Sequence, residues 1–66
     1  MNIVLNGQPR EVGQRITLAN LLVELNLEPR HVAVEVNRDV VPRTRHARAV
    51  LQEGDRVEIV TFVGGG

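Results

Sequence analysis

Three stretches of the chain carry the apolar, β-branched pattern of strands, at residues 2–5, 32–36 and 57–63. In residues 32–36, valines alternate with alanine and glutamate, and this period of two places the valines on one face of a strand. Residues 57–63 are apolar on almost both faces, which is typical of a strand in the middle of a sheet. We therefore expect a sheet whose central strand is the last one in the sequence.

Turn residues divide these stretches. Asn6-Gly7 follows the first strand and predicts a hairpin, because a type I′ turn needs positive φ at both central positions. The returning strand, over residues 8–12, contains Pro9, which cannot donate to a ladder and so places the strand at a sheet edge. Turns at 37–39 and 53–55 flank a short edge strand over 40–42 and an irregular or 3₁₀ segment over 43–50.

One amphipathic helix is predicted between the second and third strands. Leucines at 18, 21, 22 and 25 recur on one helical face, and Thr17 is placed to cap the first turn. Asn26 fits a left-handed residue after the helix, and Pro29 prevents continuation. About nine residues do not form a stable helix alone in water, so we expect the leucine face to pack on the sheet.

This order of elements predicts an α+β domain of two layers. We expect a mixed sheet of four to five strands with one main helix packed on one face, and the first and last strands as parallel neighbours. This is the ubiquitin-like β-grasp arrangement. Residues 1–63 would form the domain, and residues 64–66 a flexible C-terminal glycine tail, because glycine loses the most backbone entropy on ordering.

Composition narrows the function classes. The chain has 66 residues, of which 42% are hydrophobic, and eight arginines balance eight acidic residues. A net charge of zero argues against nucleic acid, and no apolar run approaches the roughly 18 residues of a membrane span. We therefore expect a cytoplasmic protein that contacts no membrane. Cys, Ser, Lys, Tyr and Trp are absent, which removes most nucleophiles and makes an enzyme improbable.

Several side chains are candidates for binding or chemistry. His31 and His46 have no metal-ligand spacing around them and are predicted to be exposed loop residues. Arg43 lies in an arginine-rich stretch, with Arg38, Arg45 and Arg48, that fits a solvated loop better than a patch steering toward an acidic partner or a phosphate site. Val60 and Phe62 form a partner surface if Val57 and Ile59 face the helix; the opposite assignment is equally compatible with the alternation.

The C-terminal glycines have two interpretations from composition. A frayed end or a remnant of an expression fusion is the more frequent case. Alternatively, a segment without side chains can thread a narrow channel and present its carboxylate inside the active site of another protein. That carboxylate is an unreactive anion at neutral pH, so the partner would have to activate it, for example as an acyl-adenylate.

Taken together, a series of short motifs resembles the thiamine-pathway sulfur carriers, the ThiS family. The resemblance covers essentially the whole chain, and its fragments are specific in combination rather than singly. They are I-V-L-N-G at 3–7, Thr17-Leu18 with Leu21-Leu22, V-A-V-E-V-N at 32–37, V-V-P-R at 40–43, E-G-D at 53–55 and V-G-G-G at 63–66. One departure is His46, which stands where the family often has an aromatic residue. Any partner contact or packing that the family's aromatic side chain makes is therefore in doubt for this chain.

The resemblance implies a carrier with no bound cofactor, free as a monomer. Gly66 would be adenylated with ATP by a ubiquitin-activating-like (ThiF-like) enzyme and converted to a thiocarboxylate with sulfur from a donor protein. A ThiG-like thiazole synthase would take that sulfur, and Gly64 and Gly65 would be the lead that enters each partner. The alternatives are a small-subunit molybdopterin synthase-type carrier and a non-catalytic β-grasp module that docks a partner through its sheet.

Overall fold

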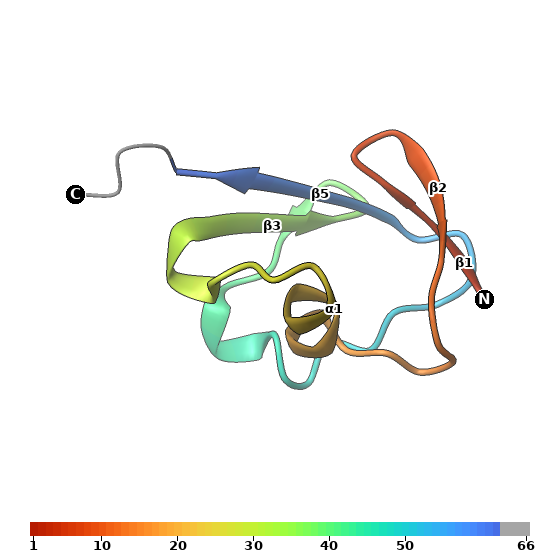
Figure 1. Cartoon of the computed structure of the whole chain (residues 1–66), viewed down its shortest axis with the longest axis horizontal. Coiled ribbons are helices and arrows are strands. Elements are labelled where there is room, and N and C mark those ends of the chain that lie inside the picture. Colours follow the sequence, from red (N-terminus) through yellow and green to blue (C-terminus); the bar gives the residue numbers. More distant parts are fainter. Residues whose placement is uncertain (63–66) are drawn as a thin grey trace.

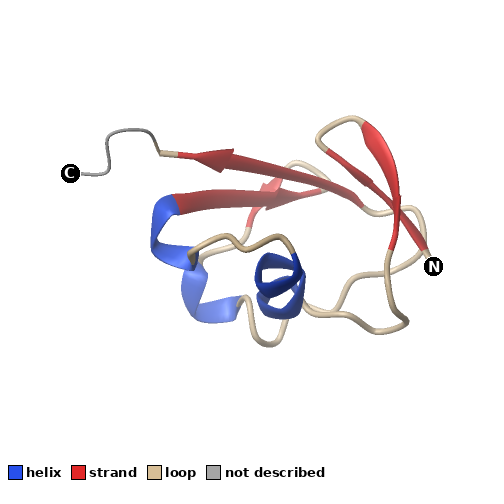
Figure 2. Cartoon of the chain, viewed as in Figure 1, coloured by secondary structure: helices blue, strands red, loops and turns tan. Residues whose placement is uncertain are grey.

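A computed structural model describes residues 1–62 of the chain. Within these residues, five strands form one sheet and α1 lies against one of its faces (Figures 1 and 2). The elements in chain order are β1 Asn2–Leu5, β2 Gln8–Glu11, α1 Leu18–Glu24, the 3₁₀ helix η1 Pro29–His31, β3 Val32–Val36, β4 Asp39–Val40, the 3₁₀ helix η2 Arg43–Arg45 and β5 Arg56–Thr61.

The last strand occupies the centre of the sheet, as its apolar sequence predicts. The strand order is β2-β1-β5-β3-β4, with β5 parallel to β1 and antiparallel to β3. The edge strands are β2, which contains Pro9, and the two-residue β4. The mixed two-layer architecture is therefore confirmed. The boundaries differ slightly, since β4 begins one residue before the predicted strand and β5 ends at Thr61.

Two hairpin turns of the same backbone type flank the central part of the sheet. Asn6 and Gly7 have φ angles of 49° and 81°, the positive values that a type I′ turn requires. Asn37 and Arg38, between β3 and β4, have φ angles of 51° and 73°. Asparagine enters this region more easily than most residues, so both turns begin on the residue that makes them least costly.

Both ends of α1 are capped as its sequence predicts. The Thr17 hydroxyl oxygen accepts a hydrogen bond from the Asn20 amide at 3.1 Å. At the other end Asn26 adopts a φ of 58°, and the amide of Leu27 donates to the carbonyl of Leu22 at 2.9 Å. These bonds satisfy backbone groups that a helix of seven residues leaves unpaired at its ends.

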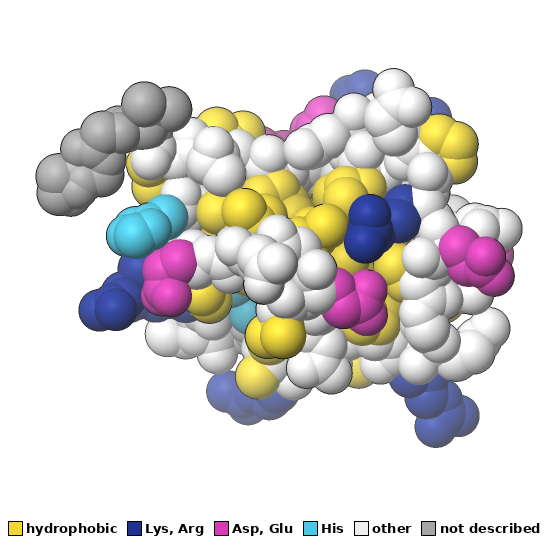
Figure 3. Space-filling model, in the orientation of Figure 1, with side chains coloured by type: hydrophobic (Ala, Val, Ile, Leu, Met, Phe, Trp, Pro, Cys, Tyr) yellow, Lys and Arg dark blue, Asp and Glu magenta, His cyan; other side chains and the backbone are white. Residues whose placement is uncertain are grey.

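The core lies between α1 and the sheet. Its largest fully buried side chains come from both layers: Ile3, Leu18, Leu21, Leu22, Val34 and Val57. Leu25 and Leu27 pack against this cluster but are only partly buried, and hydrophobic side chains remain visible between α1 and β3 in Figure 3. The leucine face of α1 is thus core, and its packing fixes a helix too short to persist alone.

Adjacent residues of α1 provide a test of this packing. Leu22 is fully buried, whereas Val23 is 73% exposed. We expect Leu22→Ala to lower the free energy of unfolding by about 2–5 kcal/mol, because it removes buried methyl groups and leaves a cavity. Val23→Ala should change it by no more than about 0.5 kcal/mol. Urea unfolding measures both, and equal losses would contradict the assigned helix face.

Candidate functional site

The face of the sheet opposite α1 carries exposed apolar side chains near the end of β5. Val57 and Ile59 point into the core, so the alternate residues point away from it. Val60 is 60% exposed and Phe62 is 54% exposed. Of the two assignments compatible with the sequence, the structure therefore has the one that places both on the open face.

Strand pairing defines what surrounds these residues. Val60 lies opposite Ala33 of β3, and Ala33, Val60 and Phe62 together form what we call the open-face patch. The next pair of the two strands on this face is Glu35 opposite Glu58, so two carboxylates border the patch. Ala33 was not among the predicted contact residues, although its alternation with the buried valines of β3 was a signal for its outward position.

The backbone holds the patch in place up to Phe62. The amide of Phe62 donates to the carbonyl of His31 at 2.8 Å, which extends the β3–β5 pairing by one residue past Thr61. Gly64, Gly65 and Gly66 lie outside the described residues. In the sequence they follow this held segment after a single valine, so the candidate site consists of the open-face patch and the tail that continues from it.

The arginine-rich stretch is divided in space. Arg43, Arg45 and Arg48 are exposed in and after η2, and no acidic residue occurs in residues 40–52. Arg45 and Arg48 line a groove of about 570 Å³ with Val41 and Ala49. Arg38 instead lines a smaller hollow of about 120 Å³ beside Arg56 and Val4. Within residues 1–62 only Arg30 and Glu28 form an ion pair, so the arginines near η2 are solvated.

The prediction that His46 is exposed is wrong, whereas His31 is exposed as predicted. The His46 side chain is 4% exposed, and its Nε2–H donates to the carbonyl of Val41 at 3.0 Å. The reason is that residues 46–51 run beside the start of α1: the amides of Leu18 and Ala19 donate to the carbonyls of Ala49 and His46. His46 is the residue that directly follows η2.

The burial of His46 changes what histidine means at a position where the ThiS family often has an aromatic residue. The ring packs inside the domain and bonds to its backbone, so the residue type there acts on packing rather than on an external contact. The burial of His46 was not predictable because an irregular segment has no hydrophobic period that separates inward from outward positions.

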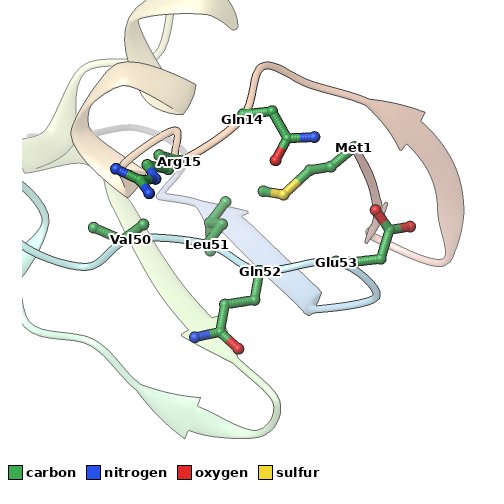
Figure 4. Close-up of a pocket in the computed structure, with 7 residues that line it drawn as sticks. All are labelled: Met1, Gln14, Arg15, Val50, Leu51, Gln52 and Glu53. Carbon is green, nitrogen blue, oxygen red and sulfur yellow. The ribbon is translucent and has the colours of Figure 1, made fainter.

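Other parts of the described surface offer little chemistry. A hollow of about 380 Å³ near the N-terminus is lined by Met1, Gln14, Arg15, Val50, Leu51, Gln52 and Glu53 (Figure 4). Glu53 already accepts a hydrogen bond from the Asn2 amide. Among residues 1–62 no three His, Cys, Asp or Glu side chains gather as a metal site, and no helix is long and apolar enough to cross a bilayer.

Comparison with known proteins identifies the family. A sequence model of the ThiS family matches residues 3–66. The chain belongs to the ThiS family. It is 40% identical over 50 residues to the sulfur carrier protein ThiS of Bacillus subtilis, covering 76% of each chain. It is also 42% identical over its full length to a thiazole synthase of Paramagnetospirillum magneticum, but spans only 20% of that protein.

A solved structure agrees with this assignment. The crystal structure of the thiamine biosynthesis protein (ThiS) from Geobacter metallireducens superposes with a TM-score of 0.86 at 33% identity, and each chain is covered completely. The mixed sheet with α1 on one face is therefore the ubiquitin-like β-grasp fold of the ThiS family, as the resemblance implied.

The buried histidine can be tested within this ThiS fold. We expect His46→Ala to lower the free energy of unfolding by about 1–3 kcal/mol, because it leaves the Val41 carbonyl without its donor. His31→Ala, at an exposed ring, should stay within about 0.5 kcal/mol of the parent. Urea midpoints at one fixed pH compare the two variants, and a stability-neutral His46→Ala would show that the buried bond contributes nothing.

Proposed function

We propose that this chain is a sulfur carrier protein of thiamine biosynthesis and that the carboxyl group of Gly66 carries the sulfur. The observation that supports this most strongly is the ThiS family match over residues 3–66, which includes the terminal glycines. The open-face patch adds a surface for recognition on the same strand that leads to those glycines. The domain, residues 1–63, would act in the cytoplasm as a monomer when free.

The chemistry is supplied by partners. A free carboxylate is a poor acyl donor, and attack of its oxygen on the α-phosphorus of ATP gives an acyl-adenylate and releases pyrophosphate. Sulfur delivered by a donor protein at the oxidation level of sulfide then attacks the acyl carbon and expels AMP, which leaves a thiocarboxylate on Gly66. A donor that carries the sulfur as a persulfide first forms an acyl disulfide, which a thiol must reduce to release the thiocarboxylate. In this scheme the carrier binds no cofactor, and ATP is consumed by the ThiF-like adenylating enzyme.

Glycine suits the positions that enter a partner. Gly64 and Gly65 have no side chains, so a channel that admits them can close tightly around the backbone and exclude water from the reacting carboxylate. A β-branched residue at position 65 would not fit such a channel. We therefore place the reaction at the terminus. Recognition is proposed to occur at the open-face patch, with Arg43 as a further contact.

The sulfur acceptor is proposed to be a ThiG-like thiazole synthase. Two relatives named thiazole synthase contain a segment similar to this entire chain, which makes up 20% of their length. A carrier-like segment in one polypeptide with a thiazole synthase supports this class of acceptor over the molybdopterin synthase alternative.

Transfer of sulfur can be detected by mass. Incubation with ATP, the adenylating enzyme and a sulfur source should increase the intact mass by the difference between one sulfur and one oxygen atom. A variant lacking Gly66 should show no increase, because the reacting carboxyl is displaced by one residue. If the parent keeps its mass while the shortened variant binds the partner equally well, the chain is a binding module.

The proposed docking of the adenylating enzyme on the open-face patch can be tested separately. Val60→Asp places a charge where an apolar side chain would be desolvated, and loss of a hot spot costs at least about 2 kcal/mol, or roughly a thirtyfold rise in Kd. Calorimetric titration with the adenylating enzyme measures this change. Val23→Asp, on the exposed face of α1, is the matched control and should leave Kd within about twofold. Equal Kd values for both variants would exclude the patch from the interface.

A further inference from the structure

The side chain of Asn6 is bonded to the central strand 53 residues away. Its Oδ1 accepts from the amide of Ile59 at 2.8 Å, and its Nδ2 donates to the carbonyl of the same residue at 3.2 Å. The backbone of β1 has already ended at Leu5 and turns away with a positive φ at Asn6. The amide group therefore takes the place of the next residue in a parallel strand.

This contact is the last one that holds β5 from the β1 side. The amide of Asn6 donates to the carbonyl of Val57, and its side chain pairs with Ile59. Alternate residues of a strand direct their backbone groups to the same side, so Thr61 is the next residue to face this side. Within residues 1–62 no strand pairs with Thr61 there, and the segment after Ile59 is held from the β3 side only.

The position of this bond relates it to the candidate site. Val60 and Phe62, the exposed residues of the open-face patch, are the first and third residues after Ile59, and the terminal glycines follow. A strand paired on one side only has fewer restraints on its twist and bend than a strand paired on both sides. Asn6 thus fixes the last point at which the β1 side holds β5 before the open-face patch.

We infer that Asn6 is a positioning residue for activation of the terminus. By fixing Ile59, it holds the end of β5 and the open-face patch in place for the adenylating enzyme, two residues before the glycines in the sequence. The inference rests on the proposed function. Small misplacement of a reacting group is costly, since about 1 Å can lower a rate by about a hundredfold.

The chain contains a matched control at the other end of β5. Asn37 also begins a hairpin turn with positive φ, and its Oδ1 accepts from the amide of Arg56 at 3.0 Å. Its Nδ2 donates to the carboxylate of Asp55 at 3.1 Å. Asn37 therefore holds the start of β5 by the same chemistry, far along the strand from Val60 and Phe62.

The test compares Asn6→Gly with Asn37→Gly. Glycine keeps the positive φ of each turn and removes only the side-chain amide. The melting temperatures of the two variants should fall by similar amounts. In adenylation assays well below both midpoints, Asn6→Gly should lower kcat/KM about tenfold and Asn37→Gly less than twofold. Hydrogen exchange at Ile59 should accelerate more in Asn6→Gly than in Asn37→Gly, where any acceleration should follow only the lower global stability.

The outcomes separate the inference from the function on which it rests. If the parent is adenylated and both variants match its kcat/KM, Asn6 is only a stabilising residue and the positioning role is overturned. If both variants lose activity equally, the effect follows stability and the inference fails as well. If the parent itself is not adenylated, the proposed function fails first, and the positioning role fails with it.

Discussion

The pairing of β5 with strands from two distant parts of the chain is the constraint on which the remaining structure depends. β5 joins β1, from the first residues, to β3, from the middle, and without it the two hairpins share no ladder. The same strand contributes Val57 and Ile59 to the core under α1. A domain of this size buries only about 60% of the surface of its unfolded chain, so it has little other packing to replace that contribution.

Alternation lets this one strand serve two purposes. Val57 and Ile59 stabilise the fold from one face, and Val60 and Phe62 are free for recognition on the other. Substitution of an outward residue removes little buried area, so the surface can change without loss of the core. On this open face Val60 and Phe62 lie beside Ala33, while Val40 of the edge strand, which pairs with Glu35, is a separate exposed apolar residue.

Local signals made much of the fold predictable. Asn6-Gly7, Thr17 and Asn26 each fit a backbone conformation that their own side chains favour, and the structure has each in that role. The direction of Phe62 was not predictable, because Val57–Val63 is apolar at both parities. His46 was predicted wrongly, since its burial follows from how residues 46–51 run beside α1 and not from any period. The bond from Asn6 to Ile59 joins residues too far apart in sequence for a local pattern to indicate.

The composition of the chain explains why the position of its terminus matters. The chain has neither cysteine nor lysine, so neither a thiol nor a lysine amine of its own can attack an activated terminus. A protein that leaves catalysis to its partners contributes chiefly the position of its reacting group. That position begins where the sheet last holds the chain: Phe62 bonded to His31 on one side and Ile59 bonded to Asn6 on the other. The two bonds lie on opposite edges of β5, so together they restrain the end of the strand from both sides.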